Sequence, residues 1–404
     1  MSGSLQLAAT PLMDRLIART VRAGLPLSVH FDLTYRCNER CIHCYLDHDD
    51  RGELSTNECI NVLEQLARSG ALFLTFSGGE IFLRKDFEEI LSVARRLHFD
   101  VSLKSNALLI TRERAAMLKR HGVRRVQISI YSEEAAVHDA ITKVPGSLQR
   151  SLAAIPLLQA QGIQVKIACP LMKQNLLAYR GVMALAGRLN IPYVLDMTIT
   201  PMMDGGHAPL EHRVSPDALL AVLQDEALHS CGTRAPVAEF DSLPMTGSSV
   251  SSGIESAAYE DLPCSAGHNS CYISPYGDVY ACVQLPIPAG NLRKVPFEQI
   301  WKHAPALGRI RSVRESELPV CSSCEIRAYC ERCPGLAWME GGDLLGAYER
   351  ACSLAEQKAR LAGVANARSA WRKTTSVETS RPASGSAPLA PSHSAPKEEE
   401  RVVV

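Results

Sequence analysis

The sequence predicts an α/β protein in which parallel strands alternate with helices and are followed by a small cysteine-rich domain. One observation is a series of six short runs rich in β-branched and aromatic residues, each followed by a helical pattern. Another is that eight of the 14 cysteines lie between Cys264 and Cys352, where apolar periodicity is weak. In addition, 46% of the 404 residues are apolar, which excludes a disordered chain.

The six strands are expected to alternate with helices along the first half of the chain. They are residues 29–35, 72–76, 101–104, 126–131, 165–168 and 193–199. Ser55 with Glu58 forms a capping box at one helix start. Asp86 with Glu89 can cap the next helix, and Thr111 begins another. Six consecutive units require parallel strands joined by right-handed crossovers, so the sheet is either open and doubly wound or part of a β/α barrel.

Composition divides the chain into five segments. They are an amphipathic N-terminal helix (1–27), the strand-helix domain (28–231), a linker or cover segment rich in Ser, Gly, Ala and Pro (232–263), the cysteine-rich domain (264–362) and a disordered tail (363–404). An Arg-rich transit peptide is the alternative interpretation of the first segment. The cysteine-rich domain has too few apolar segments to fold without cross-links or metal.

Charge and hydropathy exclude several classes of partner. Lys plus Arg number 43 and Asp plus Glu number 43, so the net charge does not favour a nucleic-acid partner. No apolar run approaches the roughly 18 residues of a membrane-spanning helix. Asp14 and Arg15 interrupt the N-terminal apolar stretch, which a secretory signal would keep intact. We therefore expect a cytoplasmic protein with no membrane partner, in which 14 cysteines indicate metal or redox chemistry.

A C-x3-C-x2-C run directly follows the first predicted strand and consists of Cys37, Cys41 and Cys44. Three thiolates at the carboxyl end of a strand can converge on one soft metal centre. Three ligands on a four-iron cluster leave one iron open for a small molecule, as a catalytic zinc site keeps one open position. His43 is the nearby residue that could instead close the trio as a zinc site.

With this run the chain resembles the radical S-adenosylmethionine (AdoMet) enzymes. The resemblance implies a partial (β/α)6 barrel in which Cys37, Cys41 and Cys44 hold a catalytic [4Fe-4S] cluster whose open iron binds AdoMet. It also implies that one electron cleaves AdoMet to a 5′-deoxyadenosyl radical. An electron donor such as flavodoxin or ferredoxin is the expected source of that electron.

Polar residues after the next three strands are similar to those of the same family. By this resemblance Gly78, Gly79 and Glu80 contact the AdoMet amino group. Asn106 and Ser129 contact the nucleoside by the same resemblance. In physical terms, the glycines leave bare backbone close to the ligand, and the carboxylate can receive an ammonium group.

The sequence departs from the family after the fourth strand. There the family often carries a His-Asp pair followed by an Arg that meets the AdoMet carboxylate. In this chain His138 and Asp139 are followed by Ala-Ile-Thr and then Lys143, without an Arg. Lys143 is the expected substitute.

The cysteines of the second region form a pattern similar to the SPASM extension, a C-terminal domain that holds auxiliary iron-sulfur clusters. Eight thiolates suffice for two four-iron clusters. By resemblance, Cys264, Cys271, Cys282 and Cys333 hold the first auxiliary [4Fe-4S] cluster, and Cys321, Cys324, Cys330 and Cys352 hold the second. The spacing from Cys330 to Cys333 is C-x2-C, one residue shorter than in the family. A four-cysteine zinc knuckle within residues 321–333 is the alternative, and it leaves the other cysteines of the region unexplained.

The resemblance also implies an activity, namely the oxidative modification or crosslinking of a side chain in a ribosomally made peptide or protein. Val283 stands where sulfatase-maturing members carry an Asp acid-base, and the stretch 198–206 resembles the peptide maturases more closely. A step in haem or quinone cofactor biosynthesis is the alternative within the family. A passive iron-sulfur or zinc scaffold is the alternative outside it.

The geometry of such a barrel leads to two further expectations. The stretch before residue 28 is too short for a leader-peptide-binding domain of about 80 to 100 residues, so a separate partner or the second domain should recognise any leader. A barrel of six units also lacks two strands of a full one. We expect its open side to admit an extended peptide that adds as a strand.

Overall fold

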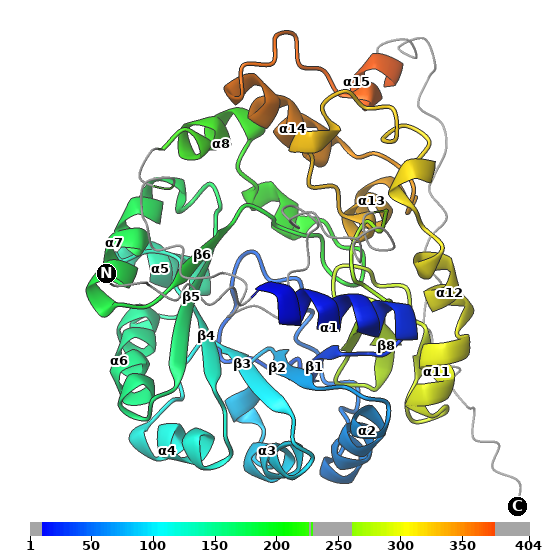
Figure 1. Ribbon diagram of the computed structural model, residues 1–404. Coiled ribbons are helices and arrows are strands. Elements are labelled where there is room, and N and C mark those ends of the chain that lie inside the picture. Colours follow the sequence, from blue (N-terminus) through cyan, green and yellow to red (C-terminus); the bar gives the residue numbers. More distant parts are fainter. Residues whose placement is uncertain (1–9, 226–227, 229–260, 376–404) are drawn as a thin grey trace, which may run out of the picture.

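The computed structural model describes residues 10–225, 228 and 261–375, and these form a single nine-stranded sheet with surrounding helices. The order of the strands across the sheet is β6-β5-β4-β3-β2-β1-β7-β8-β9. The sheet curves, and most of the helices that connect its first six strands lie along its outer side (Figure 1). The predicted α/β partial barrel is therefore confirmed.

All six predicted strands of the barrel are present. They are β1 (Ser28–Thr34), β2 (Phe73–Gly78), β3 (Asp100–Ser105), β4 (Arg125–Ser129), β5 (Gln164–Pro170) and β6 (Tyr193–Asp196). Each strand pairs in parallel with the next one along the chain. Their carboxyl ends therefore lie on the same side of the barrel, where the loops that carry functional residues meet.

The helices between these strands are α2 (Thr56–Arg68), α3 (Phe87–Arg96), α4 (Arg112–Arg120), α5 (Ala135–Thr142), α6 (Ser147–Ala160) and α7 (Tyr179–Leu189), with short 3-10 turns η1 (Ile81–Leu83) and η2 (Leu176–Ala178). The capping box of Ser55 and Glu58 is present at the start of α2. Thr111 caps α4 as predicted. The prediction for Asp86 is wrong, because its carboxylate binds Arg84 and Thr56 and does not cap α3. A guanidinium is a stronger partner for a carboxylate than a backbone N–H.

Side chains of β1 alternate between the hydrophobic core and the barrel interior. Val29, Phe31 and Leu33 are fully buried in the core between the sheet and its helices. His30 and Asp32 lie on the opposite face of the strand, since successive side chains of a strand point to opposite sides. The first strand therefore contributes two polar side chains, His30 and Asp32, to the barrel interior.

The cysteine-rich region extends the barrel sheet. Its first strand, β7 (Ser270–Ile273), pairs in parallel with β1, and a hairpin then adds β8 (Asp278–Tyr280) and β9 (Gly290–Asn291). The predicted turn at residues 275–278 joins β7 to β8. The expectation of an open barrel side is therefore corrected at the β1 edge, which β7 covers, and among the described strands β6 pairs only with β5.

The C-terminal elements also contact the segment that follows β6. These elements are α11 (Phe297–His303), α12 (Pro305–Arg311), η4 (Glu315–Glu317), η5 (Arg327–Tyr329), α13 (Pro334–Gly341), α14 (Glu349–Leu361) and α15 (Ala370–Thr375), and the segment contains η3 (Ala208–His212) and α8 (Pro216–Leu223). Arg213 forms an ion pair with Glu340 at 2.6 Å, and α14 packs against α8 (Figure 1). The cysteine-rich region thus contacts both β1 and the segment after β6, the two ends of the partial barrel.

The ends of the chain differ in part from the expected segments. The N-terminal helix is α1 (Thr10–Ala23), whose Ile17 is buried against Leu27. Residues 363–375, which composition assigned to a disordered tail, form a turn and α15, because Ser369 binds Glu356 and Ala367 is buried on α14. The linker at 232–260 and the tail from 376 lie outside the described residues. No helix in the described ranges is long and apolar enough to span a membrane.

Candidate iron-sulfur and AdoMet site

The three cysteines of the first run lie in the loop that leaves β1, and the structure brings their thiols together. Cys37 and Cys44 lie within electrostatic range of each other, as do Cys41 and Cys44. The backbone N–H of Cys44 donates a hydrogen bond of 3.1 Å to the carbonyl of Cys41, which closes a tight turn. All three cysteines are free and half-buried, so their thiols are available as ligands.

The groups around this loop fit an iron-sulfur cluster with a polar ligand. Burial raises the pKa of the Cys37 thiol to about 12, and it raises the pKa of Glu39 to about 7. Glu39 Oε1 and His43 Nδ1 are buried without a hydrogen-bond partner. Across the described residues no three His, Cys, Asp or Glu side chains are arranged as a metal site. The three free thiols can serve as ligands of an iron-sulfur cluster. The unpartnered polar atoms of Glu39 and His43 can bind a polar ligand beside it.

Gly78 and Gly79 allow β2 to pass directly against the chain that enters the cysteine loop. A Cβ atom on Gly78 would lie 2.1 Å from the Thr34 carbonyl oxygen, and one on Gly79 would lie 2.3 Å from that of Arg36. Gly79 N–H donates to the Thr34 carbonyl at 2.8 Å. The observed close approach is thus between two backbone segments, whereas the sequence suggested an approach of backbone to ligand. These glycines hold the start of the cysteine loop in place.

Glu80 connects the ends of β2 and β3 beside Cys37. Its side chain is fully buried and accepts hydrogen bonds from the Ser105 hydroxyl at 2.9 Å and from the Asn106 backbone N–H at 3.0 Å. Burial raises the pKa of this carboxyl group, and the hydrogen bonds oppose that shift. The Glu80 carboxylate also lies within electrostatic range of the Cys37 thiol. The structure therefore brings Glu80 to the first cysteine run.

The two predicted nucleoside contacts lie at the same end of the barrel. Asn106 follows β3, and its side-chain amide donates to Asn38 at 2.7 Å, within the cysteine loop. Ser129 ends β4, is half-buried and interacts with the hydroxyl of Tyr131, which lies 3.8 Å from Cys41 Sγ. Both residues are therefore close to the cysteine run.

The expected substitute for the missing Arg lies elsewhere. Lys143 caps the end of α5 in the left-handed conformation and is exposed. Arg150, in α6, is the cation that interacts electrostatically with Glu39. Asp139 accepts hydrogen bonds from the Gly146 and Leu148 N–H groups and so stabilises the start of α6. Arg150 is consequently the better placed cation for an anionic group at this loop.

The structure gathers three of the four cysteines assigned to the first auxiliary site. The thiols of Cys264, Cys282 and Cys333 lie within electrostatic range of one another. Cys271, on β7, is buried on the core face of that strand, and its thiol interacts with Arg311. These three thiols therefore form one group, and Cys271 lies apart from it.

All four cysteines assigned to the second auxiliary site lie together. The Cys330 thiol interacts with Cys321 and Cys324, and the Cys352 thiol interacts with those three. This grouping links Cys352, on α14, to the loop cysteines and separates Cys333 from them. The arrangement differs from a zinc knuckle made of residues 321–333 alone, because Cys333 lies with the first group.

A buried polar network inside the barrel was not predicted from the sequence. The Tyr272 hydroxyl on β7 donates to Asp32 Oδ2 at 2.9 Å and lies 2.6 Å from the Tyr35 hydroxyl. Asp32 Oδ1 lies 3.0 Å from Nε2 of His30, whose side chain is 20% exposed. The available signal was the pair His30 and Asp32, which alternates with the apolar residues of the run Val-His-Phe-Asp-Leu. The network leads from the barrel interior to a histidine that solvent can reach.

The interior face of the central strands is polar as well. Lys104, Gln127 and Lys166 are register neighbours on β3, β4 and β5. Lys104 is exposed and lies within electrostatic range of the Cys282 thiol. The barrel interior therefore presents charged and hydrogen-bonding groups near the first auxiliary group of cysteines.

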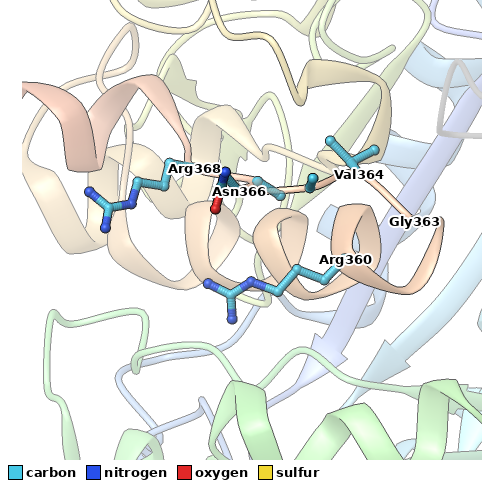
Figure 2. Close-up of a pocket in the computed structure, with 7 residues that line it drawn as sticks. Arg360, Gly363, Val364, Asn366 and Arg368 are labelled. Carbon is cyan, nitrogen blue, oxygen red and sulfur yellow. The ribbon is translucent and has the colours of Figure 1, made fainter.

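A separate pocket of about 430 Å³ lies at the surface between α14 and α15. The side chains of Arg360 and Arg368 extend toward the same side of it, and the loop residues 363–367, among them Val364 and Asn366, form the rest of its lining (Figure 2). None of the predicted site residues lines this pocket. The chemistry of the cysteine sites therefore lies elsewhere.

Comparison with known families matches two segments of the chain. Residues 31–183 match the Radical SAM superfamily, and residues 264–325 match SPASM, an iron-sulfur cluster-binding domain. The first match contains the C-x3-C-x2-C run, and the second contains the first five cysteines of the auxiliary region.

Similar proteins include two curated enzymes and one solved complex. The chain is 29% identical to the AdoMet-dependent heme synthase of Methanosarcina barkeri, over 79% of this chain and 94% of that protein. It is 31% identical to the mycofactocin maturase MftC of Mycobacterium ulcerans, over 74% of this chain and 80% of that protein. Streptococcus suis SuiB bound to the precursor peptide SuiA has a similar fold, with a TM-score of 0.59, 17% identity and coverage of 80% of this chain and 75% of that one.

Proposed function

Because this chain belongs to the radical SAM superfamily and carries a C-terminal SPASM iron-sulfur domain, we propose that it oxidatively modifies or crosslinks a side chain of a ribosomally made peptide or protein. The observation that carries the proposal is the edge strand β6. It is the last strand in the sheet order of the described residues, so we propose that an extended peptide lies along it beside the barrel interior. The mycofactocin maturase and the fold of SuiB, which was solved with a precursor peptide, support the peptide as substrate.

In this proposal Cys37, Cys41 and Cys44 hold a [4Fe-4S] cluster, and Glu80, Asn106 and Ser129 surround AdoMet together with the Gly78-Gly79 turn. When bound, the cluster and AdoMet supply a 5′-deoxyadenosyl radical that removes one hydrogen atom from the substrate. Arg150, through its position near Glu39, is the cation that we assign to the AdoMet carboxylate.

Formation of one crosslink removes a second hydrogen from the peptide, as a proton and an electron. Asp32 is placed to accept the proton, because its carboxylate is linked through Tyr272 to Tyr35 on one side and contacts the partly exposed His30 on the other. Cys321, Cys324, Cys330 and Cys352 would hold one auxiliary cluster. Cys264, Cys282 and Cys333 would hold the other, for which Cys271 stays the predicted fourth ligand although its thiol lies apart from theirs in this structure. The chemistry of both clusters when bound is one-electron transfer, which suits the second oxidation.

The test is to incubate the anaerobically reconstituted enzyme with AdoMet, a reductant and short peptides encoded beside its gene. We expect a peptide to stimulate 5′-deoxyadenosine formation and to lose about two mass units per crosslink, which corresponds to two hydrogens. Unchanged peptides would contradict the proposal, most clearly if a haem or quinone precursor is consumed instead. Haem biosynthesis is the second candidate, because the heme synthase relative aligns over 94% of its own length.

A further inference from the structure

The segment Cys330-Glu331-Arg332-Cys333 connects the two auxiliary groups of cysteines. Cys330 interacts with Cys321 and Cys324, whereas the next cysteine, Cys333, interacts with Cys264 and Cys282. Three residues of fully extended chain span at most about 11 Å. The two groups are therefore close neighbours, and Arg332 lies on the segment between them.

The Arg332 guanidinium has an unused donor in this position. Its Nε donates to the Gly346 carbonyl at 2.9 Å, and its Nη2 donates to the Leu344 carbonyl. Nη1 is buried and has no hydrogen-bond partner. A buried, charged donor without a partner is costly, so such a group normally faces a ligand or ion that binds there.

The charge of Arg332 acts on both groups of thiols. It lies within electrostatic range of Cys264 and Cys333 in the first group, and of Cys321 and Cys330 in the second. The neighbouring acid, Glu331, pairs with Lys358 at 2.8 Å. In the part of the chain that the structure describes, Arg332 has no carboxylate partner. Its charge is therefore not neutralised by a nearby acid.

We propose that Arg332 is a positioning residue shared by both auxiliary clusters, which raises the reduction potential of each. This inference rests on the cluster ligation in the proposed function. Four thiolates make a [4Fe-4S] site anionic, and its reduction adds one more negative charge. A fixed cation in a poorly solvated position favours the reduced state, and Nη1 can in addition donate a hydrogen bond to a cluster sulfur.

Arg327 provides a matched control. It also lies within electrostatic range of Cys321, but its guanidinium forms an ion pair with Glu315. Its charge is thus compensated, and it is associated with the second group alone. Replacing it should change the potentials less than replacing Arg332.

The experiment is an anaerobic potentiometric titration followed by electron paramagnetic resonance on the full-length, reconstituted protein. Cys44→Ala is present in every sample, so that the signals come from the auxiliary clusters. We expect Arg332→Gln to move the midpoint potentials of both clusters to more negative values. Arg332→Lys should give a smaller shift of the same sign, because lysine keeps the positive charge but lacks the planar guanidinium group and its several fixed N–H donors. Arg327→Gln should shift at most the second cluster, and by less.

Unchanged midpoints in Arg332→Gln with about eight irons bound would overturn the proposal, and a shift confined to one cluster would overturn the shared role. If the Gln variant cannot be loaded with iron, Arg332→Lys decides the question, since unchanged midpoints in that variant also overturn the proposal. Zinc with few irons in the Cys44→Ala parent would overturn the cluster ligation itself. That failure is distinguishable, because it appears in the metal content before any titration.

Discussion

The hydroxyl of Tyr272 donates a hydrogen bond of 2.9 Å to the carboxylate of Asp32, although the two residues are 240 positions apart. Asp32 belongs to the first barrel strand and Tyr272 to the first strand of the cysteine-rich region. The parallel pairing of β1 with β7 creates this contact. The barrel interior is therefore completed by a residue from the auxiliary region.

Replacing Tyr272 by Phe should uncouple radical formation from product formation. The variant keeps the ring but removes the hydrogen bond that orients Asp32, so we expect product formation to fall roughly 10-fold or more while 5′-deoxyadenosine is still made. Tyr280→Phe is the control, because its ring lies 5.6 Å from that of Tyr272 on the neighbouring strand. Equal ratios of product to 5′-deoxyadenosine in both variants and the wild type would argue against the proton-accepting role of Asp32.

Replacing Cys44 by Ala should abolish reductive AdoMet cleavage and lower the iron content by about four, while the auxiliary clusters stay in place. Cys59→Ala is the matched control, because Cys59 is a buried cysteine of α2 that packs in the core. Chromatography of 5′-deoxyadenosine and an iron assay on reconstituted protein measure both effects. Continued 5′-deoxyadenosine production by Cys44→Ala would place the initiating site elsewhere.

Replacing Cys324 by Ala should affect the second auxiliary group alone. We expect the variant to lose about four irons and to stop making product, yet to retain some AdoMet cleavage, because initiation depends on the first cysteine run. Comparison of iron content, 5′-deoxyadenosine and product with those of Cys44→Ala separates the two sites. Normal turnover by Cys324→Ala would mean that the second group has no part in the reaction.

Gly79→Ala should displace the loop that carries Cys37. The added methyl group would meet the Arg36 carbonyl oxygen at 2.3 Å, so one of the two backbone segments would have to shift. We expect loss of about four irons and of AdoMet cleavage, with a lower unfolding temperature. Gly187→Ala in α7 is the control, since a Cβ there meets no atom within 4 Å and should be neutral or stabilise by up to about 1 kcal/mol. Wild-type iron content in Gly79→Ala would show that the contact does not hold the loop.

His138 should make the folded state less stable in mild acid. It is 1% exposed, its Nδ1 accepts the Tyr131 N–H at 3.2 Å, and burial lowers its pKa to about 4. The folded state therefore binds this proton less readily than the unfolded state, whose histidine pKa is about 6.5. The stabilisation is complete above pH 6.5 and declines as the pH falls toward 4.

Urea unfolding of the wild type at pH 7 and pH 5 measures this effect, and His138→Gln should reduce the difference between the two midpoints. His121→Gln is the control, because His121 is a partly exposed histidine beside Glu88. The same pH dependence in the wild type and His138→Gln would contradict the assignment.

The features that the sequence predicted well depend on short-range patterns. The strand predicted at 72–76, which is β2 (Phe73–Gly78), the capping box of Ser55 and the cap at Thr111 each follow from residues a few positions apart. The first cysteine run directly follows a predicted strand, and this position likewise predicted that the run lies in the loop after β1. Local chemistry was sufficient for these elements because their partners are sequence neighbours.

The missed features depend on contacts between distant segments. Pairing of β7 with β1 and the Tyr272–Asp32 bond join residues about 240 positions apart, which no periodicity records. Asp86 was misjudged in part because its carboxylate also accepts a hydrogen bond from Thr56, which is 30 positions away. The role of Arg332 could not be predicted for the same reason. Its position between two groups of thiols depends on where Cys264 and Cys321 lie in the folded chain.

The pairing of β7 with β1 also determines when the enzyme can become active during its own synthesis. The ribosome completes β1 about 240 residues before β7, which at 5 to 20 residues per second is a delay of about 12 to 48 s. Until then Asp32 lacks Tyr272, and one edge of the nascent barrel is unprotected. A partly translated chain therefore lacks the completed barrel interior, so product formation, unlike AdoMet cleavage at the first cysteine run, has to wait until β7 has been synthesised.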